Sequence, residues 1–212
     1  MNAPQSINKK YFTCGPTELY PVVREFMLEA LDKKLPSISH RSKDFVIIVK
    51  YTVDELKKLM GIPDGFMIFF SSAGTECMER ILENLVEDCS VHFVNGSFSE
   101  RFYKTAKELK KNPLLHQVDY RKGFNFDEVN IPEKTELICI TQNETSTGVA
   151  VPMKKISELK DRYPNKLIAI DVVTSAPYQK IDFEKVDIAF FSVQKGFGLP
   201  AGLGVTIIRE SC

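Results

Sequence analysis

The sequence predicts an α/β protein in which a mostly parallel sheet carries helices on both faces. Three observations support this fold class. Short segments that are continuously apolar, as in strands covered on both faces, recur along the chain. Stretches with apolar residues at helical spacing lie between them. Polar loops follow five of the apolar segments, where a doubly wound sheet turns into its helices.

The strands are predicted from six apolar segments. These are FMIFF (66–70), VHFV (91–94), LICIT (137–141), LIAID (167–171), IAFFSV (188–193) and GVTII (204–208). Because none of them alternates apolar with polar residues, we expect both faces of each strand to be covered.

The helices are predicted from five stretches. These are YPVVREFMLEALDKK (20–34), KDFVIIVKYTVDELKKLMG (43–61), GTECMERILENLVED (74–88), SERFYKTAKELKK (99–111) and PMKKISELKDRYP (152–164). The second contains a β-branched run, which is a poor helix former. The third places four apolar residues on one face: Met78, Ile81, Leu82 and Leu85. The fourth ends in a basic turn that suits the negative end of a helix dipole. The fifth opens with Pro152 and stops before Pro164.

The 212 residues allow one large domain or two small ones, and their composition is that of a globular protein with no broad electrostatic footprint. Lys+Arg and Asp+Glu both number 28, so the net charge is zero, and we expect neither nucleic acid nor a membrane as partner. The five cysteines form no CxxC pair and the three histidines show no ligand spacing, so we expect reduced thiols and no metal. The opening residues lack the apolar core of a signal peptide, and no apolar run approaches spanning length, so we expect a cytoplasmic location.

Polar loops at the ends of five predicted strands mark the candidate site. They are SSAGTE (71–76), NGSFSE (95–100), QNETSTG (142–148), DVVTSAP (171–177) and QKGFG (194–198). Ligands of doubly wound sheets gather at the carboxyl ends of the strands. We therefore expect the five loops to share one rim.

Lys195 is the most informative residue of these loops. It follows an apolar strand and precedes a glycine-rich segment, so its amine is expected to lose hydration. Desolvation lowers the pKa of a lysine and makes the free amine available as a nucleophile. The neighbouring glycines would let a bulky cofactor approach closely. The structural alternative is a lysine whose tip reaches solvent at the rim.

Two further features accompany this lysine. Asp171 ends the preceding strand, where a carboxylate either caps the next loop or pairs with a cation in the cleft. Gly74 and Thr75 open a helix directly after a strand and offer N–H groups and a hydroxyl to a phosphate, although an ordinary capped helix start gives the same pattern. Together they match what pyridoxal 5′-phosphate requires: an amine to bond its aldehyde, a carboxylate for its pyridine nitrogen and a phosphate site. Lys195 would also carry a proton between the substrate α-carbon and cofactor C4′.

From FTCGPTELYPVV to TIIRE, the motifs resemble class V, fold-type I pyridoxal-phosphate aminotransferases, most closely phosphoserine aminotransferase-like proteins. The resemblance implies that residues 1–212 form the large cofactor domain of such an enzyme. SHRSKDF implies that His40 and Arg41 face the substrate anion, and SAGTE implies a phosphate loop with Gly74 and Thr75. For the remaining positions it implies that Phe98 stacks on the cofactor ring, Thr145 bonds the phenolic oxygen, Asp171 pairs with the ring nitrogen, and Gln194 lies beside Lys195.

Three departures from the family pattern matter. Thr75 stands where phosphoserine enzymes often carry a basic residue, and Val173 replaces a serine. The sequence stops at Cys212, whereas family members continue into a C-terminal small domain. The resemblance places the arginine for the substrate α-carboxylate in that domain. It also implies a homodimer in which the partner supplies a further loop.

The first functional hypothesis is transamination of a small amino acid with a 2-oxo acid, phosphoserine with 2-oxoglutarate, in serine biosynthesis. Thr75 keeps alanine–glyoxylate or serine–pyruvate transamination, or a class V lyase, as an alternative. A cofactor-binding or inert fragment is the third hypothesis.

Overall fold

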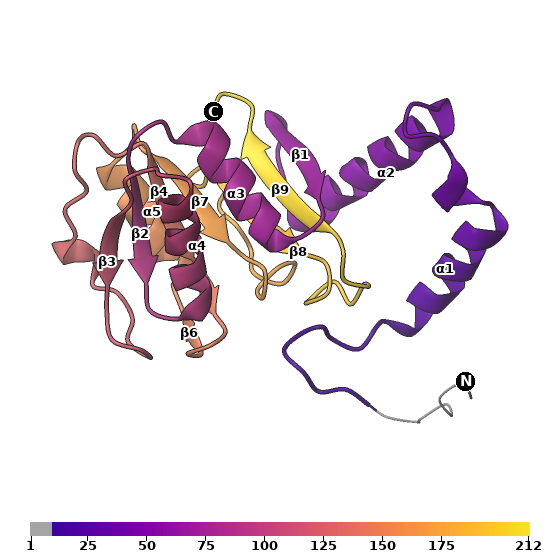
Figure 1. Ribbon diagram of the computed structural model, residues 1–212, viewed down its shortest axis with the longest axis horizontal. Helices are drawn as coiled ribbons and strands as arrows, with labels where there is room; N and C mark the ends of the chain where they lie inside the picture. Colours follow the sequence, from indigo (N-terminus) through magenta and orange to yellow (C-terminus); the bar gives the residue numbers. More distant parts are fainter. Residues whose placement is uncertain (1–9) are drawn as a thin grey trace.

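The computed structural model describes residues 10–212 as a seven-stranded sheet with helices packed on it and an N-terminal arm (Figure 1). The expectation about a signal peptide concerns residues that lie largely outside this part. The sheet contains β1 (Phe66–Ser71), β2 (Ser90–Val94), β3 (Leu114–Gln117), β4 (Leu137–Thr141), β7 (Leu167–Asp171), β8 (Ile188–Ser192) and β9 (Gly204–Arg209), in the order β1-β9-β8-β7-β4-β2-β3. The pair β5 (Asn143–Glu144) and β6 (Val149–Ala150) forms a separate small hairpin.

Strand direction places the predicted loops together. Neighbouring strands from β3 to β8 run parallel, and β9 runs antiparallel to both β8 and β1. Two reversals make β1 parallel to β8, so β1, β2, β4, β7 and β8 all end at the same edge of the sheet. The expected mostly parallel sheet and its shared rim are confirmed.

Helices cover both faces of the sheet, as expected. Side chains of a strand alternate between the two faces, so an entirely apolar strand needs a covering layer on each face. Cys139 of β4 packs with α3 (Gly74–Leu85) and α4 (Ser97–Glu108). Ile138 and Ile140 of the same strand belong to the core beneath α5 (Met153–Arg162). The sheet therefore lies between two apolar layers.

The N-terminal arm departs from this packing. It consists of α1 (Pro21–Asp32), the 3-10 turn η1 (Leu35–Ser37) and α2 (Lys43–Met60), and in Figure 1 it extends away from the sheet. α2 buries no residue in this chain although it is amphipathic, and Ile47 in its β-branched run is 64% exposed. Its ends are well formed: the hydroxyl of Ser42 accepts from the N–H of Phe45, and Gly61 closes the helix in a left-handed conformation at φ 65°.

The edge strand β1 corrects one expectation. Of its residues only Phe66 is buried, and Phe69 is 53% exposed. The continuous apolar run FMIFF was expected to be covered on both faces, but β1 has one neighbouring strand and lacks a helix over part of its surface. The continuous apolar run of β1 therefore belongs to a partly exposed edge strand and not to a strand of the core.

Five short elements lay outside the prediction, namely η1, β3, η2, β5 and β6. β3 pairs with β2 at the far edge, and the 3-10 turn η2 (Phe126–Glu128) contributes Phe126 to the core. Within residues 10–212, no helix combines the length and apolarity needed to cross a membrane. Nor do three or more His, Cys, Asp or Glu side chains of this part gather in a group that could hold a metal ion.

Candidate active site

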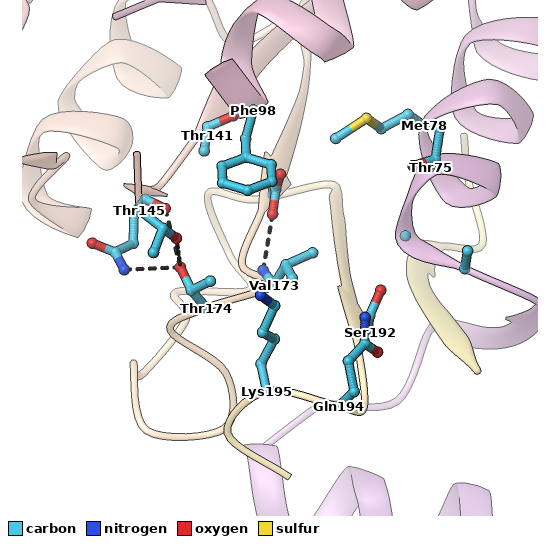
Figure 2. Close-up of a pocket in the computed structure, with 14 residues that line it drawn as sticks. Thr75, Met78, Phe98, Thr141, Thr145, Val173, Thr174, Ser192, Gln194 and Lys195 are labelled. Carbon is cyan, nitrogen blue, oxygen red and sulfur yellow. Dashed lines mark hydrogen bonds between the residues drawn. The ribbon is translucent and has the colours of Figure 1, made fainter. Parts of the chain in front are cut away.

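The loops at the shared rim enclose one pocket, shown in Figure 2. Its lining includes all seven residues predicted to contact the cofactor: Gly74, Thr75, Phe98, Thr145, Asp171, Gln194 and Lys195. In Figure 2 the ring of Phe98 and the side chain of Lys195 enter from opposite sides. The chain thus brings together residues from five loops that are far apart in the sequence.

His40 and Arg41 are not part of this pocket. Both are exposed in the turn between η1 and α2, at the end of α2 that lies away from the sheet (Figure 1). The substrate contact expected of them is therefore not formed within this chain's own pocket.

Asp171 is the buried acid of the pocket. It is 4% exposed, and its Oδ1 accepts a hydrogen bond of 2.9 Å from the N–H of Val173. Burial raises the pKa of this carboxyl to about 7 and outweighs the opposing effects of that hydrogen bond and of the Lys195 charge; the negative charge of Glu144 adds to the rise. A cation placed against Asp171 would stabilise its ionised form.

A hydroxyl network holds Thr145. The Thr145 hydroxyl donates to Thr174 Oγ1 at 3.0 Å, and the amide of Asn143 donates to the same oxygen at 2.8 Å. Thr174 in turn donates to the carbonyl of Asn143 at 3.1 Å. Thr174 and Asn143 were not predicted as site residues, yet both lie in loops whose position at the rim was predicted.

Two buried polar atoms belong to residues of the pocket wall and lack a hydrogen-bond partner in the described part of the chain. They are Thr141 Oγ1 and Gln194 Oε1. Thr141 is paired in register with Asp171 across β4 and β7. Since buried polar groups are almost always satisfied, these atoms suit a polar molecule bound in the pocket. Thr141 was missed because it reads as the last residue of an ordinary strand.

Two helices begin at the pocket, and their N-termini differ. At the start of α4, the buried carboxylate of Glu144 accepts from the N–H groups of Phe98 and Ser99 at 3.1 and 2.8 Å. At the start of α3, Ala73 supplies no side-chain cap, and the N–H groups of Gly74 and Thr75 have no acceptor among the described residues. The positive end of α4 is therefore already neutralised, while that of α3 is open to an anion.

The glycines after Lys195 correct another expectation. A Cβ on Gly196 would lie 2.3 Å from the carbonyl oxygen of Ala176, and one on Gly198 would lie 2.6 Å from the ring of Tyr20. These glycines make room for protein packing and not for a cofactor. Gly74 does adjoin the pocket, where a Cβ would meet Ser192 Oγ at 2.6 Å.

Comparison with known proteins agrees with this arrangement. The family described as Aminotransferase class-V matches residues 12–212, and the chain belongs to this family. The fold and the site thus define a pyridoxal-phosphate aminotransferase scaffold, and pyridoxal phosphate is the cofactor that family membership indicates.

Three individual proteins illustrate the similarity. The chain is 48% identical to a phosphoserine aminotransferase from Cytophaga hutchinsonii of known structure, with a TM-score of 0.93 over 96% of this chain and 56% of that one. It is 29% identical to the phosphoserine aminotransferase of Rhodococcus opacus over 93% of this chain and 52% of the relative. An aspartate aminotransferase from Thermus thermophilus is 28% identical with a TM-score of 0.79, covering 95% of this chain and 57% of the other. The chain spans about half the length of the curated relatives it matches.

Proposed function

We propose that this chain is the cofactor-binding part of an aminotransferase that exchanges an amino group between phosphoserine and 2-oxoglutarate. The observation that carries the proposal is the convergence of Lys195, buried Asp171 and the open N-terminus of α3 in one pocket. The 48% identity to a phosphoserine aminotransferase over 96% of the chain supports the choice of substrate class. A place in serine biosynthesis follows from that choice and is part of the proposal, and a cytoplasmic location is proposed with it.

The residues of the pocket fit pyridoxal phosphate. When bound, this group supplies an aldehyde that takes up amines and a ring that withdraws electrons from the substrate α-carbon. The N–H groups of Gly74 and Thr75 would hold its phosphate, and Phe98 would cover the ring. Thr145 would bind the phenolic oxygen. The unpartnered atoms of Thr141 and Gln194 lie in the same wall and offer further polar contacts.

Asp171 and Lys195 would perform the proton chemistry. The ionised Asp171 would keep a proton on the pyridine nitrogen, because its burial strengthens the attraction between the two charges. Lys195 would bond the cofactor, and its Nζ would hold the proton taken from the substrate α-carbon. An amine in this position does not need a second base, since the same nitrogen both accepts and returns the proton.

The placement of Arg41 leads to a proposal about assembly. The α1–η1–α2 arm exposes large apolar side chains, among them Phe26 at 62% and Ile47 at 64%, and it contacts little of its own chain. Exposed apolar surface of this kind marks an interaction site. We propose a homodimer in which the arm packs on the second copy, so that His40 and Arg41 reach the substrate anion of the partner's pocket.

A spectral titration of the purified protein with pyridoxal phosphate tests the function. Addition of phosphoserine is expected to shift the visible cofactor band at a lower concentration than alanine, serine or aspartate does. Arg41→Ala is expected to raise the phosphoserine concentration needed, about tenfold, while cofactor affinity stays unchanged. Lys43→Ala, which removes a nearby exposed cation, serves as control. A band that forms but responds equally to all four amino acids would exclude phosphoserine specificity, and a protein that forms no band would exclude the function.

A further inference from the structure

The segment from Thr13 to Tyr20, which we call the strap, runs across the loop that carries Lys195. The N–H of Thr17 donates to the carbonyl of Gln194 at 2.9 Å, and the Thr17 hydroxyl donates to the carbonyl of Lys195 at 2.9 Å. Tyr20 continues the contact through its N–H, which donates to the carbonyl of Gly198 at 3.2 Å. The strap is thus tied to the backbone on both sides of the lysine.

Gly15 lies in the strap directly against the Lys195 side chain. A Cβ built on Gly15 would lie 2.2 Å from Cδ, 2.6 Å from Cε and 2.3 Å from Nζ of that lysine. All three distances are far below any van der Waals contact, and they run along the outer half of the side chain up to the amine. Gly15 also has a φ of 144°, a backbone conformation that favours glycine.

The lysine loop is confined at two further points. A Cβ on Gly196 would lie 2.3 Å from the carbonyl oxygen of Ala176, outside the strap, and one on Gly198 would lie 2.6 Å from the ring of Tyr20, which belongs to the strap itself. The backbone of the loop is confined by the Ala176–Pro177 turn beside Gly196 and by the hydrogen bonds that the strap donates to the carbonyls of Gln194, Lys195 and Gly198. A side chain on residue 15 would therefore be accommodated by turning the Lys195 side chain and not by shifting its backbone.

We propose that Gly15 is a positioning residue: its lack of a side chain fixes the path of Lys195 and so the direction in which the amine enters the pocket. The proposal rests on the proposed function, because it assigns Gly15 a role toward the amine that bonds the cofactor. The strap would then act as a rigid surface that limits the conformations of the Lys195 side chain. A displacement of about 1 Å at a reacting group can cost a hundredfold in rate.

The test compares Gly15→Ala with Gly202→Ala. Both changes put alanine at a positive φ, 144° and 121°, in or beside the lysine loop, but a Cβ on Gly202 would meet nothing within 4 Å. Two ligands separate positioning from general damage. Pyridoxal 5′-phosphate binds with a bond to the lysine, whereas pyridoxamine 5′-phosphate carries an amine in place of the aldehyde and forms no such bond.

Gly15→Ala is expected to weaken pyridoxal phosphate binding about tenfold or more and to slow borohydride labelling of Lys195 similarly, with pyridoxamine phosphate affinity unchanged within about twofold. Gly202→Ala is expected to change neither ligand by more than about twofold. Equal behaviour of the two variants, or an equal loss of both ligands in Gly15→Ala, would overturn the proposal.

Two further measurements keep the proposal testable if a variant or the wild type fails. Should Gly15→Ala not fold by circular dichroism, Thr17→Val removes the hydroxyl bonded to Lys195 and is expected to cause a smaller selective loss of pyridoxal phosphate; an unchanged ratio of the two affinities would refute positioning. Should the wild type bind neither ligand, the proposed function fails by itself. The positioning role is then decided by reductive methylation of Lys195 with formaldehyde, which Gly15→Ala is expected to slow relative to Gly202→Ala.

Discussion

Replacing Asp171 with asparagine is expected to stabilise the cofactor-free protein at neutral and alkaline pH while impairing its function. Burial raises the pKa of Asp171 from its ordinary value of 3.8 to about 7. A carboxyl whose pKa is raised on folding favours the folded state only while it stays protonated. The contribution of Asp171 to the free energy of unfolding is complete below about pH 4 and is lost as the pH rises to about 7.

The size of the effect follows from the same two values. A rise from 3.8 to about 7 corresponds to at most about 4 kcal/mol of folding free energy lost above pH 7. Asparagine cannot ionise, and its amide oxygen can still accept the N–H of Val173 that Asp171 Oδ1 accepts at 2.9 Å. The variant should therefore match the wild type near pH 4 and exceed it by a few kcal/mol at pH 8.

Urea unfolding of the cofactor-free protein at pH 5, 6, 7 and 8 measures this difference. Asp64→Asn, which changes an exposed loop carboxylate, controls for the loss of one negative charge. The same Asp171→Asn protein should lose nearly all turnover in an assay of the enzyme. A stability difference that does not grow with pH, or a variant that is less stable at pH 8, would refute the reasoning about burial.

Two further predictions concern buried carboxylates, Asp187 directly before β8 and Glu144 at the pocket. The side chain of Asp187 is 5% exposed and forms ion pairs with Lys160 at 2.7 Å and with Arg209 at 3.1 Å. Asp187→Ala leaves these two cations without their partner and should lower the free energy of unfolding in urea by about 3–5 kcal/mol. A loss below about 1 kcal/mol would contradict this expectation. Burial acts to raise the pKa of Glu144, but the hydrogen bonds from Ser146 and Ser99 together outweigh burial, so the net pKa is lowered. The stability that the ionised Glu144 supplies should therefore fade as the pH drops below about 4.5. Glu144→Ala should cost about 2–3 kcal/mol at pH 7 and weaken cofactor binding, since the N–H groups of Phe98 and Ser99 lose their acceptor, whereas equal stability and affinity would exclude the positioning of Phe98 by this carboxylate.

Much of the sheet and its rim could be predicted because the relevant signals are local. A buried parallel strand is continuously apolar, and the loop after it must be polar, so the ends of β4, β7 and β8 were found from the sequence. β3 was missed because it is short and only half apolar, with alternate residues exposed.

The remaining features depend on tertiary contacts that no local pattern encodes. FMIFF in β1 has the composition of a buried strand, and its exposure follows only from its place at the sheet edge. The glycines around Lys195 predicted a close approach, but not that Tyr20, Ala176 and the lysine itself would be the groups approaching. Thr174 became a site residue through hydrogen bonds to a different loop.

The central claim is that Lys195 bonds the cofactor. The most direct test is to incubate the protein with pyridoxal phosphate, reduce it with borohydride and map the labelled peptide by mass spectrometry. Lys195→Arg, which keeps the charge but cannot form the bond, should abolish the label, and Lys180→Arg should retain it. Pyridoxyl label is expected on Lys195; label confined to other lysines, or none in protein shown to be folded, would refute the bond between this lysine and the cofactor.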